Sequence, residues 1–227
     1  MEEQFSLFES ILHTLNSEGV LNEIALIGSW CLPVYKEKYG KALDYMPTIR
    51  TTDLDFFVIK PRSIKKECNI SSLLQSMDFV VEFDRLDGFE KFSHKLLEVE
   101  FLAPRSRDGE KINICKPYNI KMLSLNYLET IPHYLMTVDF RGVKLKVPEL
   151  PFFMLHKAMI QTMRKNELKV IKDAQIVTAL GEIVVQHNEL KERTIEIFEK
   201  FPKKWKTKIK GMIKEYSPEL DQLLGEL

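Results

Sequence analysis

Two aspartates separated by a single residue stand at the start of an apolar run, in the stretch RTTDLDFFVIKP (residues 50–61). Alternate side chains of a strand point to the same face, so we expect Asp53 and Asp55 to lie side by side while Leu54 enters the core. Carboxylates this close repel each other unless a cation lies between them. Such a pair suits Mg²⁺, which takes one or two carboxylates together with substrate phosphates. An exposed turn at a strand end is the alternative.

A second acidic pair follows in the stretch KLLEVEFLAP (residues 95–104). The same alternation predicts Glu98 and Glu100 on one face of a strand and apolar side chains on the other. A third carboxylate from a neighbouring strand is then available to the aspartates. Three carboxylates near bound phosphates are the parts that two-metal phosphoryl or nucleotidyl transfer needs. Glu100 is also interpretable as an exposed residue of a half-buried strand.

The third motif is a Gly-Ser pair that ends the apolar run ALIGSW (residues 25–30). A strand that ends at Gly28 and Ser29 and turns into a helix presents backbone N–H groups and a hydroxyl at the helix N-terminus, where an anion such as phosphate is favoured. Glycine at this point allows a ligand to approach closely. An ordinary helix cap is the alternative interpretation.

The elements that must position these residues follow two different patterns. Helical spacing of apolar residues predicts a helix over residues 5–15, and Asn69 or Ser71 can cap a short one in residues 69–77. Residues 29–39 are expected to form a helical piece interrupted by Pro33. Short apolar or alternating runs predict strands. These strands cover residues 24–28, 54–59, 78–83, 95–104 and 143–148.

Beyond Pro151 the strand signals end and only helical periodicity remains. The expected helices cover residues 152–164, 168–186, 189–199 and 203–216. We therefore predict an α/β domain over residues 1–148 and a helical domain over residues 149–227. No internal repeat or long linker separates them.

Composition limits the classes of function. The chain has 227 residues, 44% of them hydrophobic, which is enough for a substantial core. Lysine plus arginine and aspartate plus glutamate both number 33, so no global charge attracts nucleic acid or membrane. The three scattered cysteines favour reduced thiols over a disulfide framework or a metal site. With neither a signal peptide nor a membrane-length apolar run, we expect a cytoplasmic protein.

Gly-Ser at a strand-to-helix turn, Asp-x-Asp on the next strand and an acidic residue on a later one resemble the nucleotidyltransferase superfamily related to DNA polymerase beta. The stretches GSW, RTTDLDFFV, VEFLAP, LHKAMIQTMR and KDAQ are most similar to bacterial nucleotidyltransferase-fold proteins, including toxins of toxin–antitoxin pairs. The resemblance covers roughly residues 20–180. It implies an α+β fold, with a nucleotidyltransferase-like mixed β-sheet flanked by helices and followed by a C-terminal helical bundle.

The resemblance also implies roles for individual residues. Gly28 and Ser29 would hold the β and γ phosphates of an NTP, while Asp53, Asp55 and Glu100 would bind two Mg²⁺ or Mn²⁺ ions. Glu100 directly precedes the stretch FLAP, as the acidic residue does in the relatives, although Glu98 competes for the assignment. The interval before Asp53 is longer than in compact members, and residues 36–47 are interpreted as an inserted loop at the acceptor or nucleotide rim.

The helical half supplies further candidates. Lys157, Gln161 and Arg164 form one polar stripe on an apolar helix, which could neutralise a triphosphate or be a solvated face. By resemblance, Lys157 is the phosphate-contacting lysine. Lys172 and Asp173 resemble a Lys/Arg-Asp pair that orders the helical half.

Two classes of function remain open. One is a metal-dependent enzyme that transfers a nucleoside monophosphate from an NTP to a hydroxyl of tRNA, of a protein or of a small molecule, and releases pyrophosphate. The other is a non-catalytic nucleotide-binding or partner-binding protein, for example one paired with an antitoxin. A lysine-rich amphipathic stretch over residues 200–214 is either a docked helix with a solvated basic side or the place where a tRNA backbone would lie.

Overall fold

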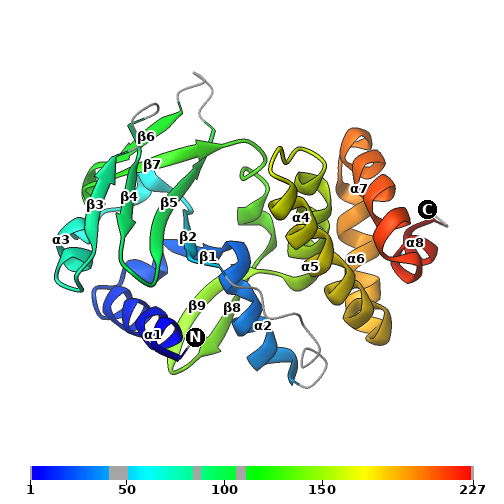
Figure 1. Ribbon diagram of the computed structural model, residues 1–227, viewed down its shortest axis with the longest axis horizontal. Coiled ribbons are helices and arrows are strands. Elements are labelled where there is room, and N and C mark those ends of the chain that lie inside the picture. Colours follow the sequence, from blue (N-terminus) through cyan, green and yellow to red (C-terminus); the bar gives the residue numbers. More distant parts are fainter. Residues whose placement is uncertain (1, 41–50, 84–87, 106–110, 226–227) are drawn as a thin grey trace. The chain divides into compact units, whose positions relative to one another are not determined.

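The computed structural model describes residues 2–40, 51–83, 88–105 and 111–225. The chain divides into two compact units (Figure 1). The first takes Met1–Val34 and Arg50–Pro148, and the second takes Tyr35–Ile49 and Glu149–Leu227. Helix α2 (Cys31–Tyr39) begins in the first unit and ends in the second.

The described part of the first unit contains one seven-stranded sheet. Its main path runs β1 (Ile24–Ile27), β2 (Asp53–Val58), β5 (Glu98–Pro104), β4 (Glu90–Ser93) and β3 (Val80–Phe83). Two further strands, β6 (Ile112–Cys115) and β7 (Ile120–Leu125), pair with each other, and β7 also pairs with β5. The β2–β5 and β5–β7 pairs are parallel and the others are antiparallel, so the sheet is mixed.

The core face of the sheet is built from aromatic side chains of neighbouring strands. Phe101 stacks on Phe56 at 5.7 Å between ring centroids and meets Phe92 edge-on at 6.0 Å. All three rings are buried. Aromatic pairs of this kind contribute beyond the area that they bury, so they help to hold β2, β5 and β4 together.

Helices α1 (Glu2–Ser17) and α3 (Ile70–Gln75) and a hairpin also belong to the first unit. Helix α1 buries Phe8 against Trp30 at 4.5 Å and against Phe140 of the hairpin β8 (Leu135–Phe140) and β9 (Val143–Pro148). Helix α3 begins at Asn69, whose side chain accepts a hydrogen bond from the Ser72 N–H. This cap confirms Asn69 and excludes Ser71 as its alternative.

The second unit consists of helices that pack together in the described residues. They are α4 (Leu150–Gln161), α5 (Glu167–Gln186), α6 (Asn188–Lys200), α7 (Lys203–Tyr216) and α8 (Pro218–Gly225). Pro151 lies in the first turn of α4, where its missing N–H costs nothing, and Asn166 caps α5. Together with the mixed sheet, these helices confirm the α+β fold expected from the sequence.

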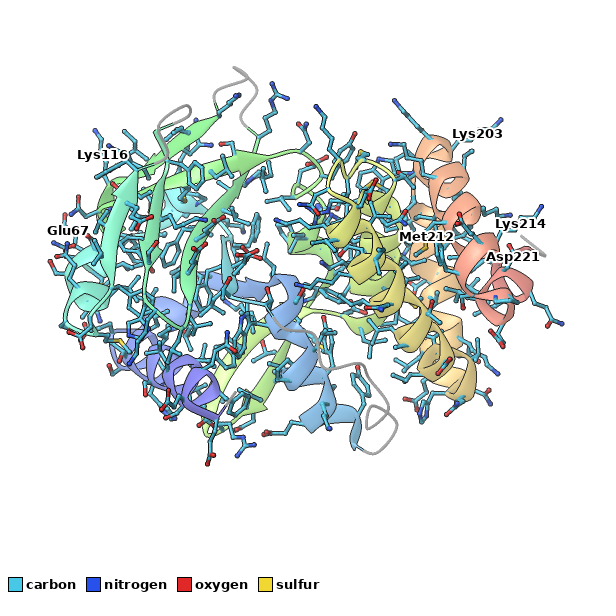
Figure 2. The ribbon with its side chains drawn as sticks, viewed as in Figure 1. Glu67, Lys116, Lys203, Met212, Lys214 and Asp221 are labelled. Atoms are coloured by element: carbon cyan, nitrogen blue, oxygen red, sulfur yellow. The ribbon has the colours of Figure 1, made fainter. Side chains whose placement is uncertain are left out.

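The lysine-rich stretch from Lys203 onward belongs to α7, which is a docked amphipathic helix, while Lys200 ends α6. Its buried face includes Trp205, Ile209 and Met212, and Met212 and Lys203 are labelled on this helix in Figure 2. The ammonium of Lys206 lies over the ring of Phe198 on α6 at 5.6 Å from its centroid. The apolar side therefore packs inside the unit, and the lysines lie at its edges and on the exposed side.

Several elements differ from the sequence prediction. Pro33 lies in the first turn of α2 and does not interrupt it. The strands β4, β6, β7 and β8 and the helix α8 were not expected. Of the expected loop over residues 36–47, residues 36–39 belong to α2, and residues 41–47 lie outside the described part of the chain. No helix among the described residues has the length and apolarity needed to cross a membrane.

Candidate active site

Asp53 and Asp55 lie at the start of β2 on one face of the strand. Both are half-buried, whereas Leu54 between them is fully buried. The expected alternation of the strand is therefore present. Both aspartates have interaction partners in the fold.

The acidic pair of β5 lies directly beside the aspartates. In the parallel β2–β5 pairing Glu98 is the register partner of Asp53, and Glu100 is the register partner of Asp55. Register partners on neighbouring strands share a face of the sheet, so four carboxylates gather on one face at the start of two strands. Glu100 is the more buried glutamate, with 16% of its side chain exposed against 36% for Glu98.

A lysine that the sequence analysis did not single out completes this face. Lys91 on β4 is the antiparallel register partner of Glu100. Its Nζ lies 2.7 Å from Oε2 of Glu98 and 3.0 Å from Oε1 of Glu100. Burial on its own lowers the pKa of Lys91, but hydrogen bonds to both glutamates and their negative charges outweigh it and raise the pKa above its ordinary value. Lys91 therefore stays charged and binds both candidates for the third carboxylate.

Gly28 brings the main chain against Asp55. The antiparallel pairing of β1 with β2 places Ile27 opposite Asp55, and Gly28 follows with a φ of 72°. A Cβ atom at Gly28 would stand 2.3 Å from Oδ2 of Asp55, which is closer than any real contact. Only glycine permits both this backbone conformation and this approach.

The Gly-Ser pair is followed by a helix, as the sequence predicts, but one turn of 3₁₀ helix precedes it. Gly28–Trp30 form the 3₁₀ turn η2, and α2 follows. The backbone N–H of Cys31 bonds to the carbonyls of Gly28 and Ser29. Ser29 is buried, with 8% of its surface exposed. The carboxylate face and the start of α2 thus meet at the contact between Gly28 and Asp55.

The candidates of the second unit gather around a buried aspartate. Nζ of Lys157 lies 2.9 Å from Oδ1 of Asp173, and Nε of Arg164 lies 3.1 Å from Oδ2 of the same residue. Lys157 and Asp173 are 7% and 2% exposed. Lys157 and Gln161 are therefore buried, and the polar stripe of α4 does not face solvent at these two positions. The ion pair of Asp173 with Lys157 therefore joins α5 to α4.

Lys172 neighbours Asp173 on α5, but the cations that neutralise the Asp173 carboxylate come from other positions. Asp173 forms ion pairs with Lys157 and Arg164, while Lys172 has interactions of its own. Lys157 and Arg164 act first as counter-ions of a buried carboxylate. Contact of these two side chains with a phosphate stays a prediction from the sequence.

The donor set can be tested for its fit to a divalent metal. Within the described residues, no group of three or more His, Cys, Asp or Glu side chains is already close enough to hold an ion. The Asp53 and Asp55 pair nevertheless fits Mg²⁺, which binds through one or two carboxylates and completes its shell with water and substrate phosphates. Glu100 is adjacent but engaged by Lys91. The residues thus fit one metal bound together with its substrate.

The protein has a mixed sheet with paired carboxylates at the starts of two strands, a Gly-Ser turn and a helical unit that follows. These features define a nucleotidyltransferase-like protein. The nucleotidyltransferase family model matches residues 7–197, and the chain belongs to this family. No curated protein is matched significantly.

A solved structure shows the same fold. The chain is similar to an antigenic nucleotidyltransferase-like protein from Paracoccidioides brasiliensis, with 18% identity, a TM-score of 0.60 and coverage of 99% of this chain and 93% of that one. It also matches the antibiotic-resistance factor ANT(2'')-Ia, with 10% identity, a TM-score of 0.47 and coverage of 87% of this chain and 92% of that one. Neither is described as a member of a toxin–antitoxin pair.

Replacing Gly28 by alanine is expected to displace the Asp55 carboxylate. Gly142→Ala is the matched control, because Gly142 has a similar φ of 78° but open space around it. Both variants should lose about 1–2 kcal/mol of unfolding free energy from the left-handed conformation. Only Gly28→Ala should also lose Mn²⁺ affinity, by about tenfold or more, since a ligand has moved. Calorimetric Mn²⁺ titration checks this, and equal affinity in the two variants would contradict it.

Replacing Asp173 by asparagine is expected to destabilise the helical unit. The change leaves the buried Lys157 without its carboxylate, and losing one partner of a buried pair costs about 3–5 kcal/mol. Glu196→Gln is the control, since Glu196 pairs with Arg193 and Lys200 on the surface, where such pairs contribute about 0–1 kcal/mol. Urea unfolding followed by circular dichroism measures both. Similar midpoints and slopes for the two variants would show that Asp173 is dispensable.

Proposed function

We propose that the protein transfers a nucleoside monophosphate from an NTP to an acceptor hydroxyl and releases pyrophosphate. The observation that carries the proposal is the contact of Asp55 with Gly28, which joins a carboxylate face to a Gly-Ser helix entry. Triphosphate oxygens can then meet backbone donors on one side and a carboxylate-bound cation on the other. The family membership of the chain agrees with an NTP substrate.

In the proposed reaction the acceptor oxygen attacks the α phosphorus, and the bond from that phosphorus to the bridging oxygen of the β phosphate breaks. Asp53 and Asp55 would hold Mg²⁺, and Glu100 would join them on releasing Lys91. The bound metal supplies charge stabilisation for the acceptor oxygen and the pyrophosphate. Gly28 and Ser29 hold and orient the β and γ phosphates, and the proton of the acceptor leaves to water or a carboxylate.

The acceptor belongs to one of three classes: tRNA, a protein side chain or a small molecule. The exposed lysines of α7 favour tRNA as the first to test, because a phosphate backbone binds such surfaces in a salt-dependent way. In this proposal Lys157, Arg164 and Lys172 contribute positive charge to the helical unit, with Asp173 holding the first two in place.

A second candidate function is nucleotide binding without transfer. The pairing of Lys91 with both glutamates favours it, because both candidates for a third metal ligand are already engaged by an ammonium. In this case Asp53 and Asp55 would bind one metal with an NTP and no acceptor would be activated.

Transfer is tested with α-labelled NTPs in Mg²⁺ or Mn²⁺, offered to total tRNA, total protein, small hydroxyl compounds and the protein itself. The wild type is expected to label one acceptor class. Asp53→Asn/Asp55→Asn should lose labelling by about a thousandfold or more, because the metal site is gone. Asp139→Asn, an exposed acid on β8, is the control. Metal-dependent NTP binding without labelling would select the second candidate, and absence of both would exclude the site.

Replacing Lys91 by methionine is expected to strengthen metal binding. The change frees Glu98 and Glu100 and raises the negative charge of the face, so Mn²⁺ affinity should increase by about tenfold or more. Lys95→Met is the control, since Lys95 is exposed in the same connection between β4 and β5. Counting bound Mn²⁺ by electron paramagnetic resonance separates tighter binding from a second ion. A weaker affinity would instead mean that Lys91 holds Glu100 in its binding position.

A further inference from the structure

A pocket of about 850 Å³ lies in the first unit at the carboxyl ends of β2 and β5. Lys60 and Arg62 reach it from the connection that follows β2, Arg105 from the end of β5, and Lys116 from the turn after β6. Asp53 and Asp55 lie at the opposite end of β2. At ~3.3 Å per residue, the five residues from Asp55 to Lys60 separate the pocket from the carboxylates by roughly 16 Å.

The pocket carries a concentrated positive charge. Four of its lining side chains are cationic, and none of the lining residues in the described part of the chain is acidic. Among the described residues, Lys60, Arg62 and Lys116 have no carboxylate partner, and Arg105 donates a hydrogen bond to the Asn126 side chain. Like charges on three separate segments repel one another, so an anion that binds them together is stabilising.

The floor of the pocket is apolar and well packed. Ile64, Ala103 and Met122 line it and are 7%, 1% and 0% exposed. The four cations, in contrast, are exposed at its rim, and Figure 2 labels Lys116 at the margin of this unit. An apolar floor with polar groups at fixed points and a volume of this size is typical of small-molecule sites.

We infer that this pocket binds a chain of phosphates, as in a nucleoside triphosphate, without a metal ion. Four cations match the charge of about −4 on such a ligand, and the exposed apolar side chain of Ile114 in the lining can contact the base. A nucleic-acid backbone spreads its charge along an extended groove, whereas these four cations converge on one pocket. The site uses neither Asp53 nor Asp55, so it is a second anion site, independent of the proposed transfer.

The test is calorimetric binding in EDTA at low salt, with ATP, inorganic tripolyphosphate and AMP as probes. One ATP is expected to bind per chain, and AMP should bind about tenfold more weakly or worse because it has lost two phosphates. ATP binding tighter than tripolyphosphate identifies a nucleotide as the source of the phosphates, and equal binding identifies inorganic polyphosphate. Asp53→Asn/Asp55→Asn should keep this binding, which separates it from the catalytic proposal.

Arg62→Gln/Lys116→Gln is expected to weaken ATP binding in EDTA by about tenfold or more. Lys203→Gln/Lys204→Gln removes the same charge from the exposed start of α7 and should change it less than about twofold. Thermal unfolding verifies that both variants are folded. The inference is overturned if the wild type binds no ATP in EDTA, if the two variants behave alike, or if a single-stranded RNA binds the pocket far more tightly than ATP does.

Discussion

The register between β2, β5 and β4 is the constraint on which the candidate active site depends. Leu54, Val99 and Phe92 are register partners across the three strands, and all three are fully buried. Because side chains alternate along a strand, a slip by one residue would expose this apolar row and bury the carboxylates. Burial of the apolar row therefore stabilises the register that gathers Asp53, Asp55, Glu98, Glu100 and Lys91 on the other face.

Gathering four carboxylates on one face has an electrostatic cost that cations must offset. Lys91 removes one negative charge and remains protonated because both glutamates bind it. Asp53 and Asp55 then form the part of the face where a further cation is most favourable. Gly28 fixes the position of this part, since the main chain touches the Asp55 carboxylate from the neighbouring strand. The packing of the strands, the charge of the face and the close approach of Gly28 to Asp55 thus all indicate Asp53 and Asp55 as the place for a bound cation.

The sequence predicted the features that local pattern encodes. The alternation around Asp53 and Glu98, the Gly-Ser turn and the helical half were visible because each depends on residues close together in the chain. The position of Lys91 was not visible, because β4 has only four residues and its apolar signal is a single buried phenylalanine. The hairpin with β5 could have been suspected from the short connection between Ser93 and Glu98, which are register partners.

Ion pairs between residues far apart in the chain could not be predicted from the sequence either. The adjacency of Lys172 and Asp173 suggested a local pair, but the partners of Asp173 are nine and sixteen residues away. A buried carboxylate accepts whichever cations the helix packing brings to it, and packing of α4 against α5 is not encoded by spacing within either helix. The same limit applies to the basic pocket, whose four cations come from segments that only the sheet topology brings together.

The net charge of zero conceals a separation of charge, because acidic and basic residues lie at opposite ends of the same strands. The first residues of β2 and β5 carry the carboxylates, and the connections after their last residues carry Lys60, Arg62 and Arg105. A dissolved metal ion is attracted to one end of these strands and a free polyphosphate to the other. A metal-free nucleotide is therefore repelled from Asp53 and Asp55 until a cation has bound there. In the proposed function, metal binding is therefore the condition for nucleotide binding at the carboxylates, whereas the proposed phosphate site at the basic end of the sheet needs no metal.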